Sequence, residues 1–64
     1  MRIGKNLLYC RKRKGLSQGQ VADLVGVSFQ TVSAWEHDVY LPQLEKLESL
    51  AEVLDTTIAE LCST

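Results

Sequence analysis

Two neighbouring segments of the chain each carry the start and stop signals of a short helix. Ser17 is followed three residues later by Gln20, the spacing of a capping box, in which each side chain bonds the other residue's free backbone N–H. Gly26 supplies a left-handed stop, and Ser28 offers a second N-cap almost at once. The pattern predicts two short helices, over about residues 18–25 and 29–37, joined by the tight turn Gly26-Val27-Ser28.

Apolar spacing and caps predict three further helices. Ile3, Leu7 and Cys10 share one helical face over about residues 2–14, and Gly15 ends that helix. A helix over about residues 43–54 carries apolar residues at helical spacing, namely Leu44, Leu47, Leu50, Ala51 and Leu54. Thr57 and Glu60 have capping-box spacing ahead of a short fifth helix with Ile58 and Leu61. The expected fold is an all-α, five-helix bundle forming a single domain over residues 1–64.

Length and composition exclude several classes of protein. A chain of 64 residues buries only about 60% of its unfolded surface, which leaves little room for a substrate cavity. No apolar run is long enough to span a bilayer and no signal peptide is visible, so we expect a cytoplasmic protein with no membrane partner. Cys10 and Cys62 lack the spacing of a metal site, so no metal is expected, and reduced thiols are favoured over a disulfide.

The charge is distributed unevenly along the chain. Residues 1–22 carry six basic side chains and no acidic one, whereas residues 23–64 carry eight acidic side chains and only Lys46 as a cation. The net charge of −1 is unusual for a protein that binds nucleic acid, but a locally basic face can still attract phosphates. The alternative is an ordinary solvated basic helix end.

The tight turn makes its two helices cross steeply, and Ala22 is small enough to let their axes approach. With its surroundings, this segment resembles the phage repressor and Cro family, also called the XRE-type helix-turn-helix. The resemblance covers about residues 3–61. It is carried by Arg11, Gly15-Leu16-Ser17-Gln18, Val21-Ala22, Gly26-Val27-Ser28, Val32-Ser33, Trp35-Glu36, Pro42, Leu44, Leu47 and Leu50-Ala51.

The resemblance implies that residues 29–37 form a recognition helix lying in the major groove of double-stranded DNA. Helical spacing turns Val32 and Trp35 inward, so Trp35 is expected in the core rather than as a stacking platform. The expected DNA-binding residues are Gln18, Ser28, Phe29, Gln30, Thr31, Ser33, Ala34 and His37.

Individual roles follow from side-chain chemistry and from the family pattern. Gln30 can pair bidentately with adenine, and Ser33 is a less selective partner. Phe29 either contacts a thymine methyl group or packs against the preceding helix. The resemblance implies that Gln18 grips a backbone phosphate, the alternative being a residue that merely favours the helix.

The resemblance further implies a supporting salt bridge between Arg11 and Glu36. After Glu36, however, the chain departs from the family's usual Asn-Gly and basic residue, and has His37, Asp38, Val39 and Tyr40 instead. His37 can reach a phosphate or remain inert, whereas Asp38 repels phosphate. Aspartate also adopts positive φ less readily than glycine, which leaves the shape of this loop open.

One recognition helix reads only a few base pairs, so we expect a homodimer on a palindromic operator. Ile58 and Leu61, or alternatively Leu8 and Tyr9, are the expected interface residues. The expected function is sequence-specific regulation of transcription, most simply repression, with no cofactor and no catalysis. The alternative is a protein-interaction or antitoxin-like bundle that binds DNA weakly or not at all, and a regulatory protein partner fits either interpretation.

Overall fold

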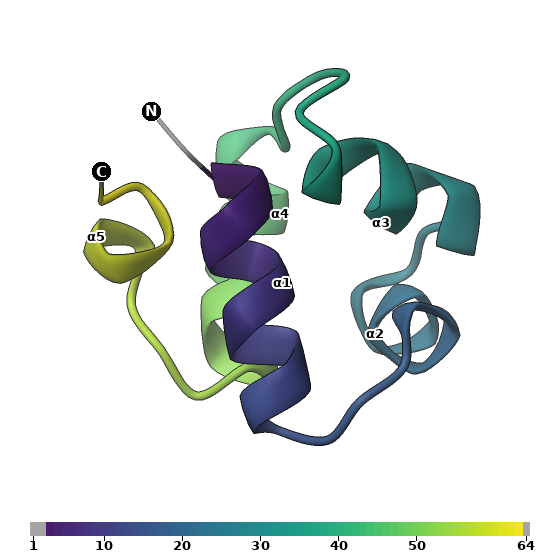
Figure 1. The fold of residues 1–64 in the computed structure, drawn as a ribbon, viewed down its shortest axis with the longest axis horizontal. Coiled ribbons are helices and arrows are strands. Elements are labelled where there is room, and N and C mark those ends of the chain that lie inside the picture. Colours follow the sequence, from purple (N-terminus) through teal and green to yellow (C-terminus); the bar gives the residue numbers. More distant parts are fainter. Residues whose placement is uncertain (1–2, 64) are drawn as a thin grey trace.

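The computed structural model describes residues 3–63, which form five helices in the order expected from the sequence (Figure 1). They are α1 (Ile3–Arg13), α2 (Gln18–Val25), α3 (Phe29–Glu36), α4 (Leu44–Val53) and α5 (Ile58–Leu61). No strand occurs among the described residues, which confirms the all-α prediction. The expected helices were slightly too long, because residues 14, 37, 43 and 54 are caps or turns instead. Residue 2, which was expected to begin the first helix, lies outside the described range.

The helix signals read from the sequence are present as hydrogen bonds and backbone angles. Ser17 and Gln20 form a complete capping box, with distances of 3.0 Å from Gln20 N to Ser17 Oγ and 2.8 Å from Ser17 N to Gln20 Oε1. Gly26, at φ 78°, ends α2 in the left-handed conformation. At the start of α3, Ser28 Oγ accepts the Thr31 N–H at 3.3 Å. These local contacts fix where α2 begins and ends and where α3 begins.

The cap of α5 is only half of the predicted capping box. Thr57 Oγ1 accepts the Glu60 backbone N–H at 3.1 Å, as expected. The Glu60 carboxylate does not return to the Thr57 backbone, and instead accepts the Thr57 hydroxyl at 3.3 Å. The reciprocal half of the prediction was therefore wrong, because the same carboxylate is engaged by the neighbouring hydroxyl.

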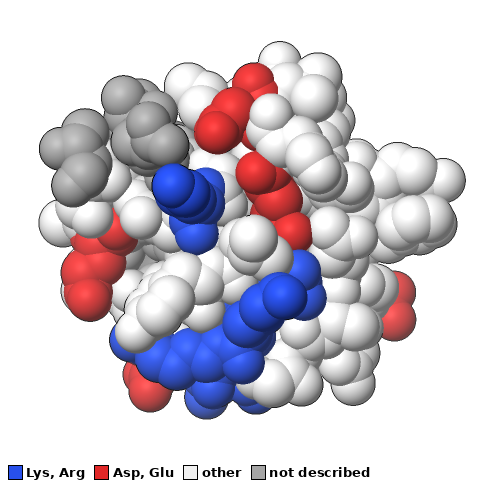
Figure 2. All heavy atoms as spheres, viewed as in Figure 1, with Lys and Arg blue, Asp and Glu red and all other residues white. Residues whose placement is uncertain are grey.

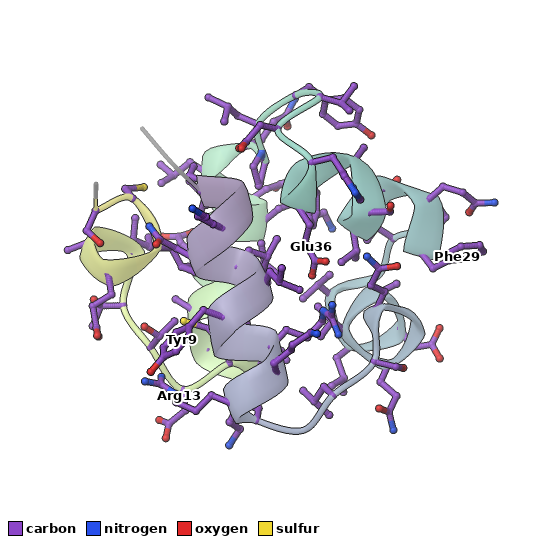
Figure 3. All side chains as sticks on the ribbon, viewed as in Figure 1. Tyr9, Arg13, Phe29 and Glu36 are labelled. Atoms are coloured by element: carbon purple, nitrogen blue, oxygen red, sulfur yellow. The ribbon has the colours of Figure 1, made fainter. Side chains whose placement is uncertain are left out.

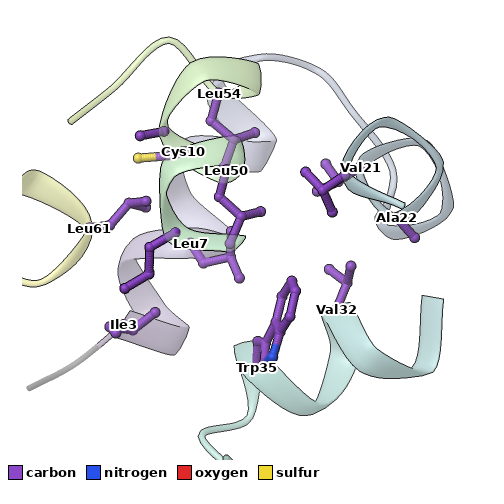
Figure 4. Close-up of a cluster of buried hydrophobic side chains, with 13 residues drawn as sticks. Ile3, Leu7, Cys10, Val21, Ala22, Val32, Trp35, Leu50, Leu54 and Leu61 are labelled. Atoms are coloured by element: carbon purple, nitrogen blue, oxygen red, sulfur yellow. The ribbon is translucent and has the colours of Figure 1, made fainter. Parts of the chain in front are cut away.

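The core lies where the helices converge, and Figure 4 shows its side chains pointing toward a common centre. Leu7, Val21, Val32, Leu50, Leu54 and Leu61 have no exposed surface. One apolar residue of α4 is exposed, and one predicted interface residue was wrong. Leu44 is 65% exposed, because it lies in the first turn of α4 and off the centre of the buried stripe. Leu61 was expected at a dimer interface, but α5 packs on α1 and α4 and buries it completely.

Two side chains join helices that are distant in sequence. Asn6 donates from Nδ2 to the carbonyl oxygens of Leu61 and Ser63, at 2.9 Å and 2.6 Å, and so ties α1 to the end of α5. Lys46 of α4 donates from Nζ to the Val25 carbonyl at 3.0 Å, where α2 ends. All three hydrogen bonds use carbonyls at or just beyond a helix end, so they satisfy acceptors that the helices leave free there.

Two further expectations from the sequence concern the state of the cysteines and the absence of a membrane-spanning segment. Cys10 is buried and Cys62 half-buried, and both carry free thiols. Among the described helices, none combines the length and apolar character needed to cross a membrane.

Candidate nucleic-acid interface

The turn between α2 and α3 is closed by hydrogen bonds to a single carbonyl. The backbone N–H groups of Gly26 and Val27 both reach the Ala22 oxygen, at 2.8 Å and 2.9 Å. Ala22 itself is only 2% exposed, since it lies in the core where α2 meets the rest of the bundle. The turn therefore fixes the start of α3 relative to α2, as predicted from Ala22 and Gly26.

Helix α3 has a buried side and an uncharged outer side. Val32 and Trp35 are 0% and 3% exposed, which confirms that Trp35 belongs to the core. The outer positions range from half-buried to exposed, and they comprise Gln30, Thr31, Ser33, Ala34 and His37. The outer side of α3 is called the α3 ridge below, and it consists of these five residues together with Phe29. The helical period had predicted this division of α3.

Phe29 begins α3 and is 55% exposed. In Figure 3 its ring lies at the end of α3 farthest from α5 and points away from the bundle. Packing against α2 does not bury this side chain, so an apolar surface remains open at the start of the ridge.

The inner side of α3 is held by an ion pair, and Glu36 points toward α1 in Figure 3. Arg11 Nε lies 2.6 Å from Glu36 Oε2, and Arg11 Nη2 lies 3.1 Å from Glu36 Oε1. The two side chains are only 11% and 3% exposed. This is the bidentate pair expected from the planar guanidinium of arginine. A third N–H of Arg11 donates to the Leu16 carbonyl at 2.9 Å and anchors the α1–α2 loop to the same group.

Gln18 joins this ion pair, which the sequence did not reveal. Its Nε2 donates to Glu36 Oε1 at 2.9 Å. An amide nitrogen carries two N–H donors, so one hydrogen remains for another partner. Gln18 is therefore more than a helix-favouring residue, because the bond holds its amide at the N-terminal end of α2.

His37 caps α3 and leaves part of its ring free. Its Nδ1 lies 2.8 Å from the Ser33 carbonyl oxygen. Since a carbonyl oxygen can only accept, Nδ1 is the donor of this hydrogen bond. This bond requires a hydrogen on Nδ1 and leaves Nε2 for an outside partner. The residue is exposed at the C-terminal end of the ridge.

Asp38 has a structural role that the sequence did not predict. It adopts φ 57°, the left-handed conformation for which glycine is usual. Its Oδ1 accepts the backbone N–H of Gly4 at 3.0 Å. A Cβ on Gly4 would lie 2.5 Å from the Glu36 carbonyl oxygen and 2.8 Å from Asp38 Oδ1, so glycine is required there. Asp38 thus caps α1 and ties the end of α3 to it, with the positive φ that the sequence had left open.

The basic residues gather on α1 rather than on the α3 ridge. Figure 2, in the same view as Figure 1, shows Lys and Arg over the C-terminal half of α1, while the surface of α2 and α3 is mostly uncharged. The last turn of α1 supplies Arg11, Lys12 and Arg13. In residues 3–63, no group of three His, Cys, Asp or Glu side chains is arranged to hold a metal ion.

The sequence was compared with protein families and with characterised proteins. A family model described as helix-turn-helix matches residues 7–61. The chain is 36% identical over 62 residues to the cryptic phage CTXphi transcriptional repressor RstR of Vibrio cholerae, covering 97% of this chain and 55% of RstR. It is 41% identical over 51 residues to the HTH-type transcriptional regulator AnsR of Bacillus subtilis, covering 80% and 44% of the two chains. The chain thus spans about half the length of these curated relatives.

Solved structures give the same picture of the fold. SinR, a master regulator of biofilm formation from Bacillus subtilis solved in complex with DNA, superposes with a TM-score of 0.88 at 31% identity, covering 95% of this chain and 98% of that chain. SinR in complex with the SinI protein gives the same TM-score over 60% of that chain. The restriction-modification controller protein C.AhdI from Aeromonas hydrophila superposes with a TM-score of 0.85 at 34% identity, covering 92% of this chain and 86% of that chain. The α2–turn–α3 unit therefore belongs to an architecture shared with these regulators.

Proposed function

Because the chain belongs to the XRE-type helix-turn-helix family, we propose that it is the DNA-binding domain of a transcription regulator, most simply a repressor. In this proposal α3 enters the major groove of double-stranded DNA, which is wide enough to admit an α-helix. We also propose that the protein acts in the cytoplasm. The domain itself needs no cofactor for this role.

One observation carries the proposal, namely an uncharged ridge on a helix that is fixed from behind. Val32 and Trp35 anchor α3 in the core, and the only acidic side chain of α3, Glu36, is turned inward and paired with Arg11. The outer side can therefore approach base edges without placing the Glu36 carboxylate near the phosphates. An uncharged recognition surface on a rigid helix is what direct readout requires.

The contacts divide into those that read sequence and those that set position. Gln30 is exposed on the ridge and can bond adenine through its amide oxygen and nitrogen, while Phe29 offers an apolar surface for a thymine methyl group. Gln18, Ser28 and Thr31 lie at the N-terminal ends of α2 and α3, where free N–H groups and the helix dipole favour a phosphate. Ser33, Ala34 and His37 complete the proposed contact surface.

The regulator is proposed to act as a homodimer on a palindromic operator, since one helix reads only a few base pairs. Leu61 is buried and takes no part in the pairing. The largest run of exposed apolar side chains lies in the α3–α4 loop and at the start of α4, and comprises Val39, Tyr40, Leu41 and Leu44. This run adjoins the C-terminal end of α3, so pairing there would hold two recognition helices in one assembly.

In vitro selection of randomised duplexes at low ionic strength tests the proposal. We expect a defined consensus whose logarithmic affinity falls linearly with the logarithm of salt concentration. Gln30→Ala should relax preference at one base position by about 1–3 kcal/mol. Gln18→Ala should weaken binding to all sequences alike, because phosphate contacts carry no sequence information.

A selection without any retained duplex would overturn the proposal and favour the protein-interaction bundle. Equal losses on every sequence from both substitutions would contradict the separate roles of Gln30 and Gln18. Thermal unfolding of both variants controls for the hydrogen bond from Gln18 to Glu36.

A further inference from the structure

Helix α1 carries a second surface that the proposed DNA contacts do not use. Lys5, Leu8, Tyr9 and Lys12 recur at helical spacing on the side of α1 away from its buried residues, and are called the α1 stripe below. Together with Asn6 they line a shallow depression of about 450 Å³. Tyr9 is 66% exposed, and Leu8 is only partly buried.

The α1 stripe faces a different direction from the α3 ridge. In Figure 3, Tyr9 and Arg13 lie on the side of α1 toward α5, while Phe29 lies at the opposite end of the molecule. The Arg13 guanidinium carbon is 5.7 Å from the centroid of the Tyr9 ring, within the range of a cation–π contact. This contact gives the exposed ring a preferred position and adds a further positive charge beside it.

The charges of the α1 stripe select among possible partners. Its apolar centre lies between Lys5, one turn earlier, and Lys12, one turn later. A second copy packed antiparallel through the same surface would bring Lys5 of one chain opposite Lys12 of the other, and a parallel copy would pair each lysine with itself. Like charges placed together oppose association, so self-pairing through the stripe is disfavoured.

We propose that the α1 stripe is a docking surface for an acidic amphipathic helix of another protein. Apolar side chains of the partner would pack on Leu8 and Tyr9, and its carboxylates would meet Lys5 and Lys12. A helical partner presents its anchors one helical turn apart. In the stripe, that spacing separates the apolar pair Leu8 and Tyr9 from Lys5 on one side and from Lys12 on the other. The proposal adds a protein partner to the proposed DNA partner, because the α1 stripe shares no residue with the α3 ridge.

A neighbouring depression indicates which side of the α1 stripe the acidic residues of the partner would face. It has a volume of about 210 Å³ and is lined by residues that include Tyr9, Arg13 and Glu60. Glu60 places a carboxylate on the α5 side of Tyr9 that offsets the charge of Arg13 in this depression, so this side offers an acidic partner no net positive charge. The partner's acidic residues are therefore expected toward Lys5 and Lys12, with its uncharged side toward α5.

A displayed library of helical peptides, selected on the immobilised domain, tests this inference. We expect enriched peptides to carry leucine or aromatic residues three or four positions apart, flanked by Asp or Glu. The double variant Leu8→Gln/Tyr9→Gln should bind the enriched peptides at least about tenfold more weakly, as for loss of a central anchor. Lys5→Glu/Lys12→Glu should invert the charge preference.

Lys14→Glu is the matched control, because Lys14 is an exposed cation that follows α1 and lies outside the stripe. It should leave peptide affinity unchanged within about twofold, since isolated surface charges contribute little. Thermal unfolding of each variant separates loss of binding from loss of fold.

Three results would overturn the proposal. The first is a selection with no enriched peptide, and the second is equal binding of the peptides to Leu8→Gln/Tyr9→Gln. The third is perturbation of the Lys5, Tyr9 and Lys12 amide resonances by duplex DNA or by anionic phospholipid vesicles, which would assign the stripe to those partners. Failure of the domain to bind DNA would leave the peptide result standing, so the two proposals can fail separately.

Discussion

The two ends of α3 are held in different ways. At the C-terminal end, Glu36 is paired with Arg11 and Gln18, and Asp38 bonds to Gly4 of α1. At the N-terminal end, the side-chain hydrogen bonds are those of the helix's own cap, Ser28. Phe29 and Gln30 at this end are exposed.

The difference shows how one helix can be both rigid and adaptable. Contacts from α1 and α2 fix the C-terminal end of α3, which sets the direction of the helix. The N-terminal end carries the residues proposed to read bases and has fewer constraints from outside the helix. We therefore expect the side chains of Phe29 and Gln30 to shift slightly to fit a given base sequence, while Glu36 moves little.

The largest effect is expected from breaking the ion pair. Glu36→Ala leaves Arg11 with an uncompensated charge in a mostly buried position, and should lower the free energy of unfolding by about 3–5 kcal/mol in urea titrations. The double variant Arg11→Met/Glu36→Leu should recover most of this loss, because it removes both charges and keeps apolar volume. A loss below about 1 kcal/mol for Glu36→Ala would mean that the pair acts as a surface salt bridge.

Gly4→Ala should have the next largest effect. The added methyl group would lie 2.5 Å from the Glu36 carbonyl oxygen, and backbone cannot move as a side chain can. We expect a loss of about 1–3 kcal/mol in the free energy of unfolding, as for other overpacked sites. Gly19→Ala is the control, since its Cβ would meet nothing nearer than Ser17 Oγ at 3.9 Å. That substitution lies inside α2 and should stabilise the protein by about 0.5–1 kcal/mol.

Asp38→Ala tests the second contact at the C-terminal end of α3. It removes the acceptor for the Gly4 N–H and places alanine at φ 57°, so we expect a loss of about 1–2 kcal/mol in the free energy of unfolding. Asp38→Asn keeps an acceptor and tolerates the left-handed conformation, and should lose much less. If the two variants have the same stability, the bond to Gly4 does not hold the loop.

The smallest effect is expected at the other end of the helix. Ser28→Ala removes the N-cap and should lower the free energy of unfolding by about 1 kcal/mol. Ser28→Gly should lower it by only about a few tenths of a kcal/mol. In native-state hydrogen exchange, the amide exchange rates should increase mainly in the first turn of α3. If Ser28→Ala lowers the free energy of unfolding as much as Glu36→Ala does, the two ends of α3 are held equally strongly.

Much of the fold could be predicted because its signals are local. Ser17 and Gln20 are three residues apart, and Gly26 acts through its own backbone. Residues within one short segment therefore determine where α2 begins and ends. Helical period also separated the buried Val32 and Trp35 from the α3 ridge. Arg11 and Glu36 were paired only through the family resemblance, and the structure contains that pair.

The remaining features depend on how the segments meet. Gly4 and Asp38 are 34 residues apart, and neither residue signals the other in the sequence. Periodicity identified Leu44 and Leu61 as apolar, but it could not show that Leu61 is buried where α5 packs on α1 and α4 while Leu44 stays exposed. The bond from Gln18 to Glu36 was missed for the same reason, since the approach of α2 to the end of α3 is a tertiary property.

The Asn6 side chain, which bonds carbonyls at the end of α5, brings the start and the finish of the folded segment to one place. A short flexible linker could therefore join them without unfolding either helix, and the exposed turn at Gly15 would serve as the new opening. Such a circular permutant would keep the same packing with a different order of helices. The architecture depends on which helices lie together, and the point at which the polypeptide is cut is secondary.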